Sequence, residues 1–138
     1  MSVATGEDIQ PAVTKRACRV EPNGTTVILN GTIDALGTEP HVLVARAFFR
    51  GECIARDVDW PQPLKYLDFG DRGVQVKAVN GKYTVTSARP TKGLWLEERD
   101  GVTLSDNCID VIPGDTQVIN VKGDIVEKPM IKYLGSDE

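Results

Sequence analysis

The side chains best suited to chemistry in this sequence are its carboxylates, which number 20. Asp57 and Asp59 are two residues apart, which places both on one face of a strand, whereas the adjacent Glu97 and Glu98 would point to opposite faces. A glycosidase needs two carboxyl groups about 5 to 9 Å apart across a bound sugar. Acids this close in sequence on a strand are usually solvated, so we predict no catalytic residue.

Oxygen ligands also gather in Ser-Asp-Asn-Cys-Ile-Asp at residues 105–110. A calcium loop is one interpretation, but the segment lacks the glycine and the terminal glutamate of a helix-loop-helix calcium site. The favoured interpretation is that Asp106 and Asn107 close Asx-turns and satisfy backbone N–H groups in a loop. We therefore expect no metal and no cofactor.

Nucleophilic catalysis would have to use the single histidine, His41, which follows Pro40 at the start of an apolar run. We expect it to be an exposed residue at a strand end. Cys18, Cys53 and Cys108 lie far apart and form no Cys-x-x-Cys pair, which argues against a zinc knuckle. We expect all three cysteines to be small buried hydrophobic residues.

Four aromatic residues could carry a binding function: Trp60, Tyr66, Phe69 and Trp95. The first three lie in a proline-bracketed segment, residues 60–69. Exposed rings there could stack on sugars, or they could pack a connector against a neighbouring domain. The second interpretation is favoured because the segment resembles a connector. Trp95 is a further candidate for sugar stacking.

Two segments match the N-glycosylation acceptor pattern, one beginning at Asn23 and the other at Asn30. Both lie in turn-forming contexts. They would matter only in a secreted protein. The first ten residues lack the basic and apolar regions of a secretory signal, which slightly favours an intracellular location but leaves the compartment unknown.

The elements that position these residues are predicted to be strands. The 138 residues include 16 Val, 9 Ile and 11 Thr, punctuated by 13 Gly and 8 Pro. The net charge of −4 argues against a nucleic-acid partner, and no apolar stretch is long enough to span a membrane. Strand-like runs occupy residues 16–20, 25–29, 41–49, 53–58, 93–97, 109–112, 116–121 and 130–134. Their number and spacing predict an antiparallel β-sandwich with little helix, in which 41–49 pairs with 53–58 deep in a sheet.

The clearest local signal lies in residues 73–88, where Asn80-Gly81 favours a two-residue type I′ turn. Closing the hairpin there pairs Val76 with Val85 and Ala78 with Tyr83. One face of the hairpin is then apolar and the other polar. Register and amphipathicity thus agree.

Four segments together resemble fungal β-mannosidases of glycoside hydrolase family 2. Residues 60–69 are similar to their interdomain connector, and 89–94 to the strand that follows it. Residues 105–115 are similar to their C-terminal signature, and 132–135 to their last strand. In that family a sugar-binding-like sandwich, a catalytic barrel and C-terminal immunoglobulin-like domains follow one another, and the catalytic glutamates belong to the barrel.

The resemblance implies an all-β, immunoglobulin-like antiparallel β-sandwich that is not an enzyme by itself. It implies the closing strands of a preceding sandwich at 16–60, a C-terminal immunoglobulin-like domain at 61–135 and a tail at 136–138. Residues 1–15 lie outside the resemblance, and their polar, aperiodic composition predicts a mobile arm. The implied partner is the catalytic barrel of the same polypeptide.

Two other functions remain open. The chain could be an independent module that binds a β-mannoside or oligosaccharide, or an immunoglobulin-like interaction domain. If residues 16–59 form only part of a sandwich, their sheet has an unpaired edge at residues 41–49. The isolated chain would then form a twofold homodimer through that edge, or cover it with residues 1–29.

Overall fold

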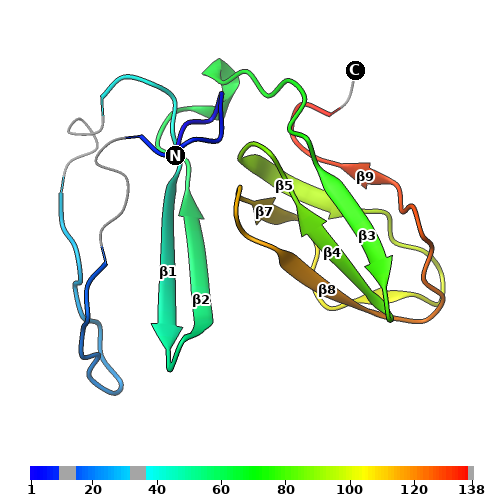
Figure 1. Ribbon diagram of the computed structural model, residues 1–138, viewed down its shortest axis with the longest axis horizontal. Helices are drawn as coiled ribbons and strands as arrows, with labels where there is room; N and C mark the ends of the chain where they lie inside the picture. Colours follow the sequence, from blue (N-terminus) through cyan, green and yellow to red (C-terminus); the bar gives the residue numbers. More distant parts are fainter. Residues whose placement is uncertain (10–14, 32–36, 137–138) are drawn as a thin grey trace.

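The structure, a computed structural model, describes residues 1–9, 15–31 and 37–136. Two units lie side by side, a two-stranded hairpin and a sandwich, joined by a connector that contains one short 3₁₀ turn (Figure 1). The elements are β1 (Leu43–Phe49), β2 (Glu52–Asp59), η2 (Leu64–Tyr66), β3 (Gln75–Val79), β4 (Lys82–Thr86), β5 (Thr91–Leu96), β6 (Thr103–Leu104), β7 (Ile109–Val111), β8 (Gln117–Lys122) and β9 (Ile131–Lys132).

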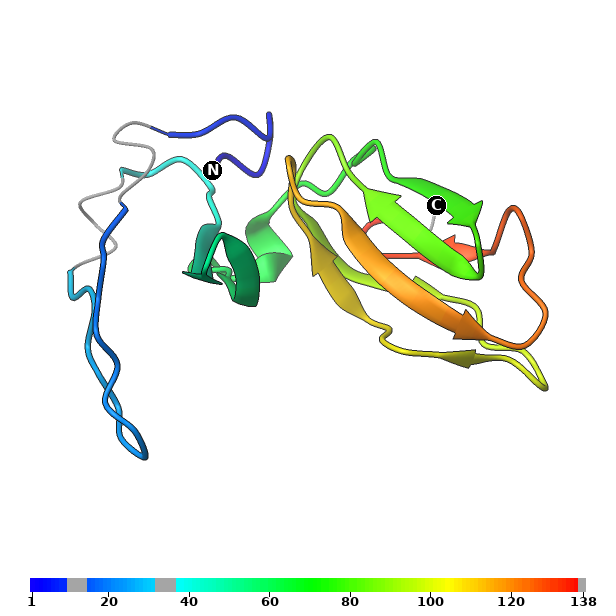
Figure 2. The ribbon, with the colours of Figure 1, turned by 60° about the horizontal axis from the view of Figure 1, so that its bottom comes forward.

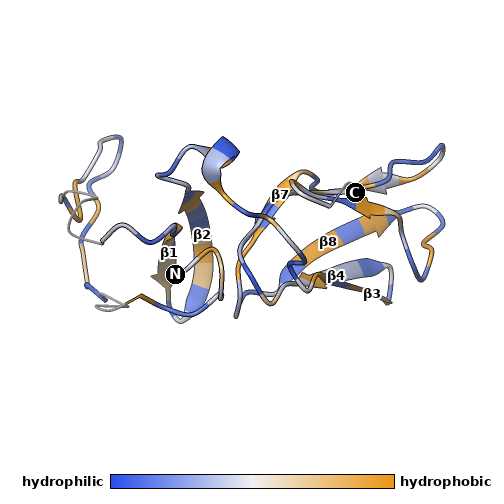
Figure 3. Cartoon of the chain, turned by 90° about the horizontal axis from the view of Figure 1, so that it is seen from above, coloured by the Kyte–Doolittle hydropathy of each residue, from blue (hydrophilic) through white to orange (hydrophobic). Residues whose placement is uncertain are grey.

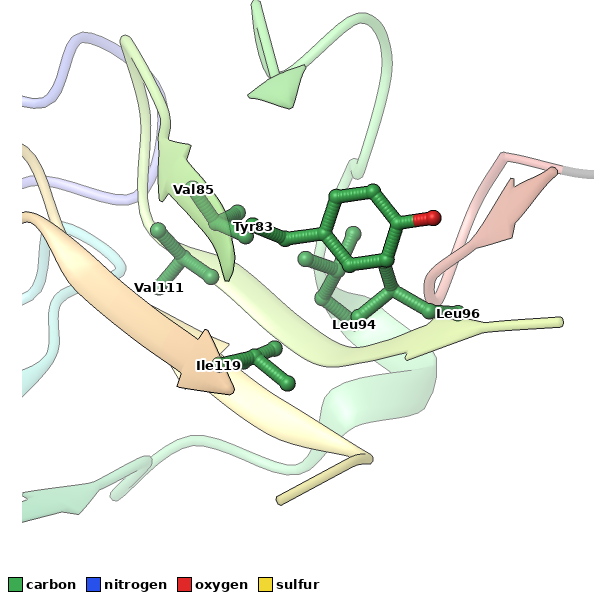
Figure 4. Packing of buried hydrophobic residues seen from close by; sticks show 6 residues of the cluster. All are labelled: Tyr83, Val85, Leu94, Leu96, Val111 and Ile119. Carbon is green, nitrogen blue, oxygen red and sulfur yellow. The ribbon is translucent and has the colours of Figure 1, made fainter. Parts of the chain in front are cut away.

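The sandwich contains a four-stranded sheet, β3-β4-β8-β6, and a three-stranded sheet, β7-β5-β9, with every pair antiparallel. Its core draws side chains from both sheets, which therefore pack face to face (Figure 4). The core residues are Tyr83, Val85, Leu94, Leu96, Val111 and Ile119. The all-β, immunoglobulin-like architecture and the low helix content are confirmed.

The hairpin β3–β4 has the predicted register. Val76 pairs with Val85 and Ala78 with Tyr83. Asn80 and Gly81 have φ values of 48° and 73°, both in the left-handed region that a type I′ turn requires. The residues of its apolar face belong to the sandwich core or pack against it, as the alternation predicts.

The hairpin β1–β2 forms where it was predicted, but its predicted burial was wrong. It is a separate two-stranded sheet rather than the centre of a larger one, and most of its residues are exposed. Phe49, for example, retains 59% of its accessible surface. The segments 16–20 and 25–29, which were expected to be strands, have no strand pairing in the structure, so no strand among the described residues extends this sheet.

Residues 1–9, predicted from their composition to belong to a mobile arm, are instead packed against other parts of the chain. Ser2 forms a bridge with His41, and the Val3 N–H donates to the Pro40 carbonyl at 3.0 Å. Val3 and Val42 are buried in a second, smaller core together with Ile112 of the sandwich. These first residues therefore link the two units. No helix in the described part of the chain is long and apolar enough to cross a membrane.

Candidate functional site: the junction between hairpin and sandwich

Asp115 joins the two units through two arginines of the hairpin. Arg46 and Arg56 are direct cross-strand partners, so they extend from the same face of β1–β2. Arg46 Nη2 lies 2.8 Å from Asp115 Oδ1, and Arg56 Nε lies 2.9 Å from Oδ2. The side chains of Arg56 and Asp115 are largely buried, whereas Arg46 is partly open to solvent. Charge-assisted hydrogen bonds to both carboxylate oxygens fix the turn after β7 against the hairpin.

Asp110 on β7 forms the second polar centre of the junction. Its Oδ2 accepts hydrogen bonds from Trp60 Nε1 at 2.8 Å and from Lys92 Nζ at 3.1 Å. Its Oδ1 accepts the backbone N–H of Gly93 at 2.9 Å, and its carbonyl accepts Arg56 Nη2 at 2.6 Å. The Asp110 carboxylate thus binds the connector and the strand β5, while its backbone carbonyl binds the hairpin.

The ring of Trp60 packs within the same junction. Lys92 Nζ lies 5.5 Å from its centroid, which is cation–π geometry, and the Phe69 ring lies 5.8 Å away at a 43° tilt. Trp60 also packs against the second core, and Phe69 is buried. The structure therefore brings two of the four candidate aromatic residues together between the units.

The other two candidate aromatic residues lie elsewhere. Tyr66 is 71% exposed, and Lys65 Nζ lies 4.7 Å from the centroid of its ring. Trp95 faces outward on β5 opposite Lys132 of β9. It lines an open groove of about 530 Å³ together with Leu64, Lys92, Gly93, Lys132, Tyr133 and Leu134.

The oxygen-rich segment 105–110 is held by hydrogen bonds within the protein. Asn107 Oδ1 accepts the Leu96 N–H at 2.8 Å, while Nδ2 donates to the Leu96 carbonyl at 3.0 Å. Asp106 Oδ1 accepts the Asn107 N–H at 2.8 Å. These contacts agree with the interpretation that Asp106 and Asn107 satisfy backbone groups in a loop. The Asn107 amide also continues the hydrogen bonding at the edge of β5. Among residues 1–9, 15–31 and 37–136, no three His, Cys, Asp or Glu side chains are grouped as metal ligands.

Arg72 is a junction residue that sequence reasoning missed. It is only 2% exposed, and its guanidinium donates to three carbonyls: Gly70 at 2.7 Å, Val3 at 2.8 Å and Asp68 at 3.3 Å. Burial lowers the pKa of the guanidinium, and the nearby Arg89 lowers it further. An arginine between Asp71 and Gly73 is typical of an exposed turn, so no local pattern indicates its burial.

The expectations for His41 and the cysteines were wrong. His41 is only 1% exposed, because the first residues of the chain pack over it, and its Nδ1 donates to the Glu39 carbonyl at 2.8 Å. Cys18, Cys53 and Cys108 are all exposed free thiols. Cys108 has a φ of 55° in the exposed loop that precedes β7.

The remaining candidates are surface residues. Asn23 lies in a turn with φ of 56° and is exposed, as is Asn30, although Thr32 of its acceptor pattern lies outside the described residues. Asp57 and Asp59 are exposed on β2. Glu98 follows β5 and accepts from Asn107 Nδ2 at 3.4 Å.

Comparison with known proteins relates the sequence of the chain to one group of enzymes. Residues 1–66 match the family described as the Mannosidase Ig/CBM-like domain. The chain is 46% identical over 98% of its length to "Beta-mannosidase B" of Aspergillus niger and equally to that of Aspergillus oryzae. The protein of the same name from Emericella nidulans is 44% identical over 89% of the chain.

The match covers only part of each relative. The chain spans about 17% of the length of the Aspergillus niger protein and 15% of the Emericella nidulans protein. The aligned region nevertheless includes nearly all of the chain, hence both the hairpin and the sandwich. Residues 1–66 are therefore similar to the Mannosidase Ig/CBM-like domain, and nearly the whole chain is similar in sequence to part of these β-mannosidases.

Proposed function

We propose that the chain is the non-catalytic C-terminal β-sandwich region of a β-mannosidase-like glycoside hydrolase of family 2. In this role it packs against the catalytic barrel of the same polypeptide and stabilises it. The observation that carries the proposal is the junction at Asp110 and Asp115, which holds the matched domain and the following sandwich in one arrangement.

The chemistry of the junction supports a structural role. Both oxygens of Asp115 are bound by arginines, and both oxygens of Asp110 are bound by N–H donors. A carboxylate whose two oxygens both accept hydrogen bonds from protein groups is a poor general acid or nucleophile, because either role would require it to release these donors. It is well suited to holding two packed units at a defined angle.

An exchange experiment in a relative tests the proposal. In the Aspergillus niger protein, the matching region is replaced by this chain or deleted. We expect the exchanged protein to hydrolyse an aryl β-mannoside with an unchanged KM and to keep its Tm, whereas the deletion lowers Tm or yields insoluble protein. A deletion variant with full activity and an unchanged Tm would overturn the proposal.

A non-catalytic role also determines how the chain should behave by itself. We expect the purified chain to hydrolyse no aryl β-mannoside, since a retaining mechanism needs two carboxyl groups held across the sugar. Turnover that disappears in a single carboxylate variant, such as Asp57→Asn or Glu98→Gln, would show an active site in this chain and refute a non-catalytic role.

Carbohydrate binding is a second candidate function, favoured by the groove at Trp95. An aromatic ring beside lysine and tyrosine side chains offers an apolar platform with polar neighbours, as sugar stacking requires. Calorimetric titration with manno-oligosaccharides tests it. Binding that is lost in Trp95→Ala and retained in Tyr66→Ala would place the sugar in this groove, while absence of binding at millimolar sugar would reject the candidate.

We also propose that the isolated chain associates through the edge of β1. Residues 1–3 cover only the start of this edge, and β2 is the only strand paired with residues 43–49 in the described part of the chain. Two copies paired antiparallel along this edge would form a twofold dimer. Light scattering across a concentration series should show dimerisation that Ala47→Pro abolishes, and a monomer at every concentration would contradict the proposal.

A further inference from the structure

The dipeptide Asn-Gly occurs three times in the sequence, at residues 23–24, 30–31 and 80–81. Because glycine has no Cβ, the backbone nitrogen that follows each of these asparagines is sterically unobstructed. Such a nitrogen can attack the side-chain carbon Cγ of the asparagine and close a five-membered succinimide ring. Closing the ring requires rotation about the asparagine ψ angle until the two atoms meet. The backbone around each asparagine therefore determines how readily the reaction occurs.

Asn80 is held by the hairpin β3–β4. Its φ of 48° belongs to the type I′ turn, and the flanking residues Val79 and Lys82 are directly paired. The Gly81 carbonyl accepts the Val121 N–H at 2.9 Å, which ties the turn to β8. Figure 3 shows β3, β4 and β8 side by side, as their pairing requires. Rotation of the Asn80 ψ angle would break these contacts, so the ring can close only when the hairpin opens locally.

Asn30 has no comparable restraint in the described part of the chain. It is exposed, lies outside any strand or turn and does not have a positive φ. The Gly31 N–H donates no hydrogen bond within the described residues, and a Cβ at Gly31 would meet no heavy atom within 4 Å. Figure 2 shows residues 15–31 as a loop that projects from the rest of the chain, and every residue of it except Thr26 is exposed. Rotation of the Asn30 ψ angle therefore breaks no contact among the described residues.

Asn23 is intermediate between these two. It is exposed, but a turn holds its φ at 56°. The arms on either side of this turn have no strand pairing, so no ladder closes it. Arg16 Nη1 donates to the Ile28 carbonyl at 3.3 Å, which joins the two arms at a distance from the turn. We therefore expect Asn23 to react more slowly than Asn30 and faster than Asn80.

We propose that Asn30 is a site of spontaneous covalent modification, at which the asparagine is converted to aspartate and isoaspartate. The Gly31 nitrogen gives its proton to solvent base and forms a bond to Asn30 Cγ, and the side-chain nitrogen takes up protons from solvent and leaves as ammonia. Water then opens the succinimide. Opening at the side-chain carbonyl yields aspartate, and opening at the main-chain carbonyl yields isoaspartate. The net reaction consumes one water, releases one ammonia and involves no oxidation or reduction.

The modification changes the chain in two ways. Both products carry a carboxylate, which adds one negative charge to the net charge of −4. Isoaspartate also inserts a methylene group into the main chain. In either product the amide nitrogen on which an N-glycan at Asn30 would be built is gone. Modification and glycosylation of this residue are therefore mutually exclusive.

Incubation of the full chain in mildly alkaline buffer tests the assignment. Samples are digested with pepsin at acidic pH, which stops the reaction, and mapped by mass spectrometry. The mass gain of an amide-to-acid conversion is followed at each asparagine, and fragmentation distinguishes isoaspartate from aspartate. We expect Asn30 to convert first and Asn80 to convert at least about tenfold more slowly, because Asn80 requires opening of the hairpin.

Two comparisons separate the effect of the fold from that of the dipeptide. In concentrated urea the three sites should react at similar rates, since glycine follows each asparagine. In the folded chain, Gly31→Ala should slow conversion of Asn30 several-fold and leave Asn23 and Asn80 unchanged. Asn80 or Asn23 reacting as fast as Asn30 in the folded chain would overturn the assignment. Conversion of Asn30 that is several-fold faster in urea than in the folded chain would also overturn it, because the fold would then restrain this site.

Discussion

At the scale of single residues, Asp115 forms both ion pairs that join the hairpin to the sandwich. It compensates two arginines that lie opposite each other on neighbouring strands, where their like charges would otherwise repel. Removing this carboxylate therefore has two effects. Two charge-assisted hydrogen-bonded contacts are lost, and the repulsion between Arg46 and Arg56 is no longer compensated.

Asp115→Ala should lower the free energy of unfolding of the hairpin unit by about 2 to 3 kcal/mol, as expected for hydrogen bonds to charged groups in a partly buried site. Urea denaturation followed by circular dichroism measures the loss. Asp100→Ala, in an exposed turn, is the matched control and should change little. Equal effects of the two substitutions would show that the arginine contacts contribute nothing specific.

Asn107 supports the edge of β5 in a way that only an amide can. Asn107→Asp keeps the acceptor for the Leu96 N–H but replaces the donor to the Leu96 carbonyl with an oxygen that repels it. We expect a loss of about 1 to 2 kcal/mol in unfolding free energy. Asp106→Asn, one residue earlier and exposed, should cost less, and the reverse order would contradict the assigned bonds.

For single residues, prediction from the sequence succeeded where neighbours in the sequence determine the contacts of a side chain. It failed where residues distant in the sequence determine them. Loop-satisfying contacts by Asp106 and Asn107 follow from residue type and position. The burial of His41 depends on Ser2 and Val3, which are distant in sequence, and the burial of Arg72 depends on the Val3 carbonyl. A pattern confined to neighbouring residues contains no information on such partners.

At the scale of elements, the two hairpins contrast. For β3–β4, the turn dipeptide and the alternation determine both register and the buried face, so the sequence was sufficient. For β1–β2 the pairing was predicted correctly. Its burial was also predicted, but β1 could be buried only if other strands lay beside it. Those strands, expected at residues 16–20 and 25–29, are unpaired in the structure, which is why the exposure of β1 could not be read from its apolar composition.

The turn at residues 80–81 gives a direct test at this scale. Gly81→Ala places a Cβ at φ of 73° and should lower the free energy of unfolding by about 1 kcal/mol. Gly24→Ala, at a turn glycine without positive φ, is the control and should cost nothing or stabilise slightly. Thermal denaturation of both variants distinguishes backbone strain from a general effect of replacing glycine.

At the scale of the whole molecule, the two cores differ in size. The sandwich core draws residues from four strands of two sheets, whereas the second core has three buried residues and depends on contacts across the junction. Stability should therefore be distributed unevenly, with the hairpin unit opening at a lower free energy than the sandwich.

Native-state hydrogen exchange should show this difference. We expect the amides of β4 and β8 to exchange most slowly and those at the β1 edge much faster, with Arg72→Met accelerating residues 1–9 and β1 but not β4. The reason is that the Arg72 guanidinium holds Val3 against the sandwich side of the junction. Uniform acceleration across both units would indicate that the chain opens as a single cooperative body.

Because Trp60 lies between the hairpin and the sandwich, its fluorescence should report whether these two units stay in contact. One indole, Trp60, is hydrogen-bonded and packed between the units, while the other, Trp95, lies in the open groove. With Trp95→Phe, Trp60 becomes the single indole fluorophore, and separation of the units would expose it to water and shift its emission to the red. If the hairpin detaches first, this shift will precede the loss of strand signal in a denaturant titration, so the coupling between the units can be followed without any attached dye.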